Sequence, residues 1–202
     1  MINTVIFDIG NVLVDFDWEG YIMRMFPGRN ELIAELDAAV WGEGRWDRLD
    51  AGDDPEEVFA SIVAHAPHRE NELRKVFANV GETLVKRAAT PSWINGLKER
   101  GYRVLYLSNY SRYVMGKNPE VLDFLPLMDG GIFSCDVKLI KPDRRIYEAL
   151  AEKYNLNPSE CVFIDDLERN VKAGKDFGFH GIQFVTLRQA QEDLNKLLKE
   201  EK

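Results

Sequence analysis

The stretch Thr4-Val5-Ile6-Phe7-Asp8-Ile9-Gly10-Asn11 decides the fold of this 202-residue chain. Its first four residues are β-branched or aromatic, which is typical of a short strand buried in a parallel sheet. Asp8, Gly10 and Asn11 favour loops, so the strand is expected to end at Asp8. The sequence therefore predicts a buried strand with a carboxylate at its carboxyl end.

Four later apolar runs end at polar residues in the same way. They cover residues 103–107 before Ser108 and Asn109, 131–133 before Ser134, 161–164 before Asp165 and Asp166, and 181–185 before Thr186. From residue 90 onward these runs alternate with helical stretches. The alternation predicts an α/β fold, with a Rossmann-like parallel sheet, right-handed crossovers and helices on both faces.

Capping residues indicate where several helices begin and end. Thr90 and Asn157, each followed by a proline, predict helix starts. Gly101 and Gly178 follow helical stretches and predict left-handed helix ends. Residues 187–202 place leucines on one face among charges, so we expect a terminal helix docked on the core.

The segment between residues 15 and 89 has helical periodicity without strand runs. Asp54, followed by a proline and by a glutamate three residues on, predicts a helix start in capping-box form. We therefore expect a small α-helical domain over residues 15–89, inserted between residues 1–14 and 90–202 of an α/β core domain.

Composition excludes several classes of protein. The chain has 26 Lys and Arg against 34 Asp and Glu, a formal charge of −8, which argues against nucleic acid or an anionic membrane as a partner. Cys135 and Cys161 lie in no zinc or disulfide spacing. No run approaches the roughly 18 apolar residues of a membrane helix, and no signal peptide is visible. We expect a cytoplasmic protein, and the sequence leaves its oligomeric state open.

The polar residues at the strand ends indicate a reaction. Ligands of α/β sheets bind at the carboxyl ends of the strands, where Asp8 would meet Asp165 and Asp166. Such crowded carboxylates need a cation, and oxygen ligands suit Mg²⁺, although Mn²⁺ is an alternative. Ser108, the Asn109 backbone amide and Lys141 are suited to phosphoryl oxygens, which leaves Asp8 free as a nucleophile. We infer phosphoryl transfer through an aspartyl-phosphate.

These residues resemble the haloacid dehalogenase superfamily, in which four motifs follow one another in a fixed order. Here they are Val5-Ile6-Phe7-Asp8, Leu105-Tyr106-Leu107-Ser108-Asn109, Ile140-Lys141-Pro142-Asp143 and Phe163-Ile164-Asp165-Asp166. Four motifs in register on predicted strand ends are a specific signal. The helical insertion between the first two motifs resembles the α-helical cap of the phosphatases of that superfamily.

The resemblance implies a role for each matching residue. Asp8 would be the nucleophile, and Asp8, the Gly10 carbonyl and Asp166 would be the metal ligands. Ser108 and Asn109 would bind phosphate, and Lys141 would neutralise both the phosphate and the nucleophile. Asp165 and Asn170 would support this shell. The implied substrate is a small phosphorylated metabolite.

Gly10 departs from the pattern, because most members have a second aspartate there as the general acid and base. Such a group contributes about 10²–10⁴-fold to the rate. The form Asp-Ile-Gly-Asn-Val most resembles a subgroup that includes a bacterial α-D-glucose-1-phosphate phosphatase and the N-terminal domain of soluble epoxide hydrolase, so a sugar phosphate is the leading substrate. A catalytically weak protein that binds a phosphometabolite in a regulatory role is an alternative, as is a haloacid dehalogenase. A phosphomutase is less compatible with Gly10.

The helical insertion contains candidate specificity residues. Its large aromatic residues are Tyr21, Phe26, Trp41 and Trp46, which are expected to pack between helices, with one or two facing the substrate. Arg45 or Arg48 is expected to join them. Asp15 and Asp17 are expected to cap or hinge the insertion rather than replace the missing acid.

Overall fold

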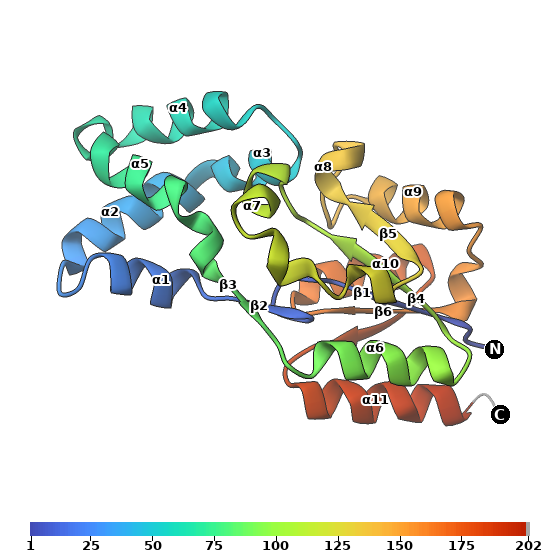
Figure 1. The fold of residues 1–202 in the computed structure, drawn as a ribbon. Coiled ribbons are helices and arrows are strands. Elements are labelled where there is room, and N and C mark those ends of the chain that lie inside the picture. The colour runs from blue at the N-terminus through green and yellow to red at the C-terminus, as the bar shows by residue number, and fades with distance from the viewer. Residues whose placement is uncertain (201–202) are drawn as a thin grey trace.

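The computed structural model describes residues 1–200, and Figure 1 shows a central parallel sheet with a helical region at one end. The sheet has the strand order β5-β4-β1-β6-β7. Its strands are β1 (Thr4–Phe7), β4 (Arg103–Ser108), β5 (Gly130–Phe133), β6 (Cys161–Asp165) and β7 (His180–Gln183). All four neighbouring pairs are parallel. The predicted α/β fold and its five strand positions are confirmed.

Helices cover both faces of this sheet, as predicted. The helices α6 (Thr90–Glu99) and α11 (Leu187–Glu200) lie on one face, and α9 (Arg144–Tyr154) and α10 (Glu168–Phe177) lie on the other. Side chains alternate between the faces. Phe7 packs edge-on against Trp93 of α6 at 4.7 Å, whereas Phe163 packs against Tyr147 of α9 at 5.7 Å.

The helical region is built from residues that lie between β1 and α6. Its helices are α1 (Trp18–Met25), α2 (Asn30–Trp41), α3 (Arg45–Asp50), α4 (Pro55–His65) and α5 (Glu70–Ala78). We call residues 15–89 the cap. At its base, β2 (Val14–Phe16) pairs antiparallel with β3 (Leu84–Lys86). The sequence reading missed these strands, because three residues are too few to give a periodic signal.

Shorter elements complete the chain. Two helices at the carboxyl edge of the sheet are α7 (Arg112–Lys117) and α8 (Ser134–Val137). The 3-10 turns are η1 (Gly42–Gly44), η2 (Pro67–Arg69), η3 (Val80–Thr83), η4 (Pro119–Leu122), η5 (Leu125–Leu127) and η6 (Pro158–Glu160). No helix in residues 1–200 is both long and apolar enough to cross a membrane. The predicted end of the terminal helix, residues 201–202, lies outside the described residues.

The predicted helix boundaries are partly confirmed. Asp54 caps α4 by accepting from the amides of Glu56 and Glu57. Gly101 and Gly178 follow α6 and α10 with φ of +85° and +122°, a region that favours glycine.

The helix start predicted at Thr90 is confirmed, because α6 begins there, although the Thr90 side chain does not cap the helix and its hydroxyl donates to the Leu13 carbonyl at 2.5 Å. The helix start predicted at Asn157 is wrong. Asn157 precedes a single 3-10 turn, because β6 begins at Cys161 and leaves no room for a helix.

The alternating faces of the sheet predict a stability effect. Leu105 is fully buried on the α9 and α10 side, and Leu105→Ala is expected to lower the free energy of unfolding by about 2–5 kcal/mol, since the surrounding helices cannot close the cavity. Urea unfolding measures this change. Val185→Ala, at a side chain that is 71% exposed, should stay within about 0.5 kcal/mol. Equal effects in the two variants would contradict the packing described here.

Candidate active site

The three central strands bring together polar residues that lie far apart in the sequence. The end of β1 lies beside β4 and β6, with Phe7 level with Tyr106 and Ile164. The Asp8 amide continues this pairing by donating to the Ile164 carbonyl at 2.8 Å. Asp8, Ser108 and Asp165 therefore stand together at the carboxyl edge of the sheet, as the strand pattern predicts.

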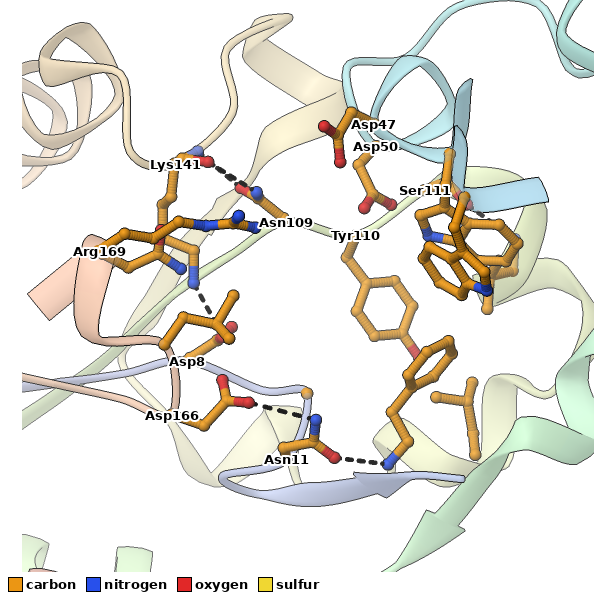
Figure 2. A pocket seen from close by; sticks show the side chains of 18 residues that line it. Asp8, Asn11, Asp47, Asp50, Asn109, Tyr110, Ser111, Lys141, Asp166 and Arg169 are labelled. Carbon is orange, nitrogen blue, oxygen red and sulfur yellow. Dashed lines mark hydrogen bonds and ion pairs between the residues drawn. The ribbon is translucent and has the colours of Figure 1, made fainter. Parts of the chain in front are cut away.

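This edge opens into a cavity of about 220 Å³ between the core and the cap (Figure 2). Predicted site residues on its wall are Asp8, Gly10, Asn109, Lys141, Asp166 and Asn170. The cap contributes Trp41, Trp46, Asp47 and Asp50. Ser108 and Asp165 do not line the cavity and lie buried behind Asp8.

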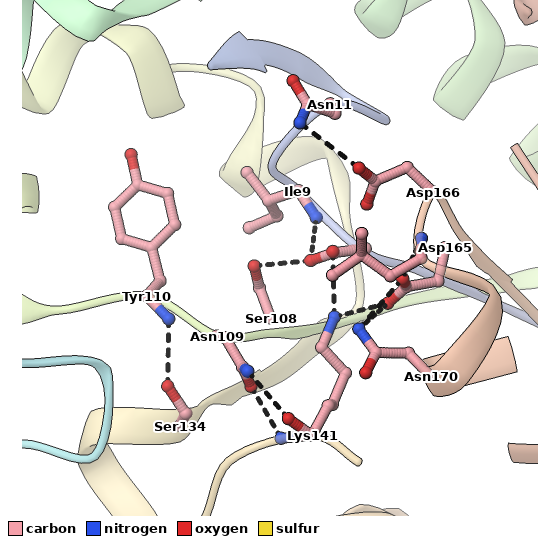
Figure 3. A network of polar contacts seen from close by, with 12 residues as sticks. Ile9, Asn11, Ser108, Asn109, Tyr110, Ser134, Lys141, Asp165, Asp166 and Asn170 are labelled. Atoms are coloured by element: carbon pink, nitrogen blue, oxygen red, sulfur yellow. Dashed lines mark hydrogen bonds and ion pairs between the residues drawn. The ribbon is translucent and has the colours of Figure 1, made fainter. Parts of the chain in front are cut away.

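Lys141 is the cation at the centre of the site. Its side chain is fully buried, and Nζ lies 2.9 Å from Asp8 Oδ2 and 2.6 Å from Asp165 Oδ2 (Figure 3). The Lys141 amide donates to Asn109 Oδ1 at 2.8 Å, and Asn109 Nδ2 donates back to the Lys141 carbonyl at 3.1 Å. The Asn109 side chain therefore positions the backbone of Lys141.

Asp165 holds the Lys141 ammonium group on the side that faces away from the cavity. Its carboxylate accepts from Lys141, from the Leu167 amide at 2.9 Å and from Asn170 Nδ2 at 3.0 and 3.2 Å. Both of its oxygens are thus engaged by the protein. A buried carboxylate with this many donors holds the ammonium group in place but has little capacity left for another ligand.

The Asp8 carboxylate is surrounded by hydrogen-bond donors and by the charges of Lys141 and Asp165. Its Oδ1 accepts from the Ser108 hydroxyl and from the Ile9 amide, both at 2.7 Å. Burial raises the pKa of Asp8 to about 7, with Lys141 opposing and Asp165 reinforcing that change. Burial also disfavours the charged form of Lys141, but Asp165 and Asp8 outweigh it and raise its pKa.

The carboxylates also form a potential cation site. One oxygen from each of Asp8, Asp165 and Asp166 lies within 4.8 Å of the others. Because Asp165 is already engaged, Asp8 and Asp166 are the carboxylates left for an ion. Asn11, which has a φ of +56°, donates to Asp166 Oδ2 at 3.2 Å and so orients it.

A second observation fits a hydrated cation here. The Oδ1 atom of Asn170 is buried and has no hydrogen-bond partner among the described residues. Buried carbonyl oxygens are normally satisfied, often by ordered water. The donors at this site, two carboxylates with carbonyl oxygens beside them, are the hard oxygen ligands that Mg²⁺ prefers.

The cap candidates divide into two groups. Trp41 and Trp46 line the cavity, as expected for one or two of the aromatic residues. Tyr21 and Phe26 are buried within the cap, where the Tyr21 hydroxyl donates to the Val76 carbonyl at 2.6 Å.

The expectation that Arg45 or Arg48 faces the substrate is wrong. Arg45 is buried and donates to the Ala38 and Ala39 carbonyls near the end of α2. Arg48 pairs with Asp53 at 2.8 Å.

The expected structural roles of Asp15 and Asp17 agree with their contacts. Asp17 caps α1 by accepting from the Gly20 amide. Asp15 lies in β2 and pairs with Arg87. Neither residue lines the cavity.

Among the residues of the cavity wall that the sequence reading missed, the ones with polar groups directed into the cavity include Asp47, Asp50 and Arg169, and Tyr110 also lines it. Asp47 and Asp50 are three residues apart, which places both on one face of α3. Their carboxyl groups and the Arg169 guanidinium have no hydrogen-bond or ion-pair partner among the described residues, and Figure 2 shows them directed toward the cavity. The i, i+3 spacing was the available signal.

Similarity to known proteins covers most of the chain. A family model described as haloacid dehalogenase-like hydrolase matches residues 2–178. The chain is 26% identical over 197 residues to D-ribitol-5-phosphate phosphatase from Bacteroides thetaiotaomicron, covering 91% of this chain and 92% of the relative. It is also 36% identical over 141 residues to bifunctional epoxide hydrolase 2 from Mus musculus. That match covers 70% of this chain but spans only 23% of the relative.

A solved structure has the same fold. A HAD family enzyme from Bacteroides thetaiotaomicron, crystallised in complex with magnesium and inorganic phosphate, superposes with a TM-score of 0.67. The two chains are 21% identical, and the match covers 91% of this chain and 94% of the other.

The buried charges predict a pH-dependent effect of removing Lys141. Lys141→Met leaves Asp8 and Asp165 buried without a cation, which is expected to cost about 3–5 kcal/mol of unfolding free energy at pH 7. The two carboxyl groups then have higher pKa values in the folded than in the unfolded state. The folded variant therefore binds more protons, and it should recover part of the loss at pH 5. Urea unfolding at both pH values tests this.

The matched control is Lys172→Met, which removes an exposed lysine paired with Asp176. It should change the unfolding free energy by less than about 1 kcal/mol at either pH. A Lys141→Met loss that grows from pH 7 to pH 5 would contradict the assignment of Lys141 as the counter-charge.

Proposed function

The chain belongs to the haloacid dehalogenase-like hydrolases, and we propose that it is a Mg²⁺-dependent phosphatase that acts on a small phosphorylated metabolite through an aspartyl-phosphate on Asp8. The observation that carries this proposal is the buried contact of Lys141 with Asp8, beside the free carboxylate of Asp166. This contact supports the proposal that Asp8 is the nucleophile, because it lies next to both a fixed positive charge and a cation site.

The chain's own residues supply the steps of phosphoryl transfer. Asp8 attacks the phosphorus atom, and the bond to the leaving oxygen breaks in line with it. Lys141 remains beside Asp8 and offsets the charge of the incoming phosphate. The Asn109 backbone amide would donate to a phosphoryl oxygen, whereas the Ser108 hydroxyl donates to Asp8 Oδ1 at 2.7 Å and holds the nucleophile in position.

Mg²⁺ would be held by Asp8, the Gly10 carbonyl and Asp166. Asn11 and Asn170 would support this set, through the bond from Asn11 to Asp166 and the unpartnered Asn170 Oδ1. When bound, the ion neutralises phosphate charge and orients the phosphoryl group. Asp165 would not bind the ion, because its oxygens already accept hydrogen bonds from Lys141, the Leu167 amide and Asn170.

The walls of the cavity favour a sugar or polyol phosphate. Trp41 is 38% exposed and packs 4.8 Å from Trp46, so the two rings form an aromatic wall facing the site. Such a wall suits the C–H face of a polyol, and the unpaired Arg169 suits its oxygens. A cavity of about 220 Å³ limits the substrate to a small metabolite. The phosphatase relative that acts on D-ribitol 5-phosphate supports the same class.

The first test is hydrolysis of 4-nitrophenyl phosphate with Mg²⁺. Asp8→Asn is expected to lower kcat by roughly 10³-fold or more, because an amide cannot form the covalent intermediate. EDTA should abolish the wild-type activity, and added Mg²⁺ should restore it.

The matched control is Asp15→Asn, which removes a carboxylate that pairs with Arg87 outside the cavity. It should retain wild-type kcat. A wild type that binds phosphate and Mg²⁺ without turnover would refute the phosphatase and favour a phosphometabolite-binding protein.

A second variant tests the substrate class. Trp41→Ala removes part of the aromatic wall, which is expected to raise KM for a sugar phosphate by about fivefold, equivalent to about 1 kcal/mol, with a smaller change in kcat. The inhibition constant Ki of inorganic phosphate should not change, because Trp41→Ala leaves the residues that would bind phosphate intact. Equal changes for both ligands would argue against contact between Trp41 and the sugar.

A further inference from the structure

At Gly10, two residues after the nucleophile, no side chain supplies an acid and the space is open. A Cβ built on Gly10 meets no atom within 4 Å, so no neighbouring side chain fills this position. In an in-line displacement the leaving oxygen lies on the far side of phosphorus from the nucleophile. With no acid on the core loop, a side chain on the wall that the cap provides, which faces Asp8 across the cavity, is the alternative source of a proton for this oxygen.

Asp50 occupies that wall. It is the last residue of α3, it is half-buried, and its carboxyl group points into the cavity that Asp8 lines from the other side (Figure 2). No described residue donates to or pairs with this carboxyl group. A carboxyl group in a cavity without a protein partner is available to a ligand.

The backbone fixes the position of Asp50 against the core. The Ser134 hydroxyl donates to the Asp50 carbonyl at 2.5 Å and accepts from the Tyr110 amide at 2.9 Å. Two residues later, Gly52 has a φ of +83°, and a Cβ there would lie 2.7 Å from the Cys135 carbonyl oxygen. The end of α3 therefore lies directly against α8.

A second unsatisfied polar group lines the same cavity. Tyr110 is 5% exposed, and its buried hydroxyl has no hydrogen-bond partner among the described residues. Burial and then the charge of Asp50 raise the pKa of this hydroxyl. The cavity therefore presents polar groups that the protein itself leaves without partners.

We propose that Asp50 of the cap is the general acid and base of this enzyme, in place of the group that Gly10 lacks; this rests on the proposed phosphatase function. In the first step the Asp8–phosphorus bond forms, the bond from phosphorus to the leaving oxygen breaks, and the Asp50 proton passes to that oxygen. In the second step water attacks phosphorus, the Asp8–phosphorus bond breaks, and the water proton returns to Asp50. Atoms and charge balance over the cycle.

The surroundings of Asp50 suit the acid role. Burial, together with the charges of Asp47 and Asp8 and against the opposing charge of Lys141, raises its pKa to about 8. Asp50 is therefore protonated at neutral pH before the reaction. Among the charged and titratable groups near it are Asp47 on its own helix and Asp8, Lys141 and Tyr110 on the core.

The test compares two substrates of similar shape, 4-nitrophenyl phosphate and 4-nitrobenzyl phosphate. The aryl leaving group needs no proton, whereas the benzyl alkoxide does. In Asp50→Asn, kcat/KM for the benzyl ester should fall by about 10²–10³-fold, and that for the aryl ester by less than threefold. The aryl ester should also give a burst of nitrophenolate, because loss of the base slows hydrolysis of the aspartyl-phosphate.

Asp47→Asn is the matched control, since it removes an acid from the same helix and the same cavity wall. It should leave the ratio of the two kcat/KM values unchanged. A ratio that changes in Asp47→Asn, or stays unchanged in Asp50→Asn, overturns the assignment of Asp50. A wild type inactive on 4-nitrophenyl phosphate with Mg²⁺ overturns the phosphatase itself. Circular dichroism and the unfolding midpoint confirm that each variant is folded.

Discussion

The contact of the Lys141 ammonium with Asp8 and Asp165 is the constraint on which the rest of the site depends. Burying an ammonium group and two carboxylates is costly unless each charge is paired and hydrogen-bonded. Asn109 fixes the backbone of Lys141, and Asn170 supplies further bonds to Asp165. The three charges still sum to −1, and Asp166 adds another carboxylate beside them. A divalent cation is what this excess charge favours, so the metal site follows from the same burial.

The sheet topology makes this arrangement possible. Asp8 and Asp165 are 157 residues apart, yet β1 and β6 are paired neighbours, and β4 brings Ser108 to the other side of Asp8. The strands β1 and β6 are buried on both faces, so each ends where its apolar run ends and presents a polar residue at the edge. The hydrophobic packing of α6, α9, α10 and α11 against the sheet therefore fixes the positions of the reacting groups.

This logic explains what the sequence could predict. An apolar run such as Thr4 to Phe7 shows where its strand ends, so Asp8 and Asp165 could be placed at strand ends without a structure. The role of Lys141 was predicted from its motif. The sequence of the cap has no local pattern that shows which of its polar side chains face the cavity. The spacing places Asp47 and Asp50 on one face of a helix, but it does not show that this face lines the cavity, while Arg45 instead binds carbonyls at the end of α2. Contacts between the cap and the core decide that difference, and they are set only by the tertiary fold.

The glycine at position 10 changes how the two parts of the molecule share the chemistry. With an acid there, the core loop would hold both nucleophile and proton donor, and the cap would only select the substrate. With Gly10, the core retains the nucleophile, while the proton donor in our proposal comes from α3. Catalysis then depends on the placement of the cap, which the Ser134 bond to the Asp50 carbonyl and the close approach of Gly52 maintain. Selection of the substrate and protonation of its leaving group would be functions of the same wall of the cavity.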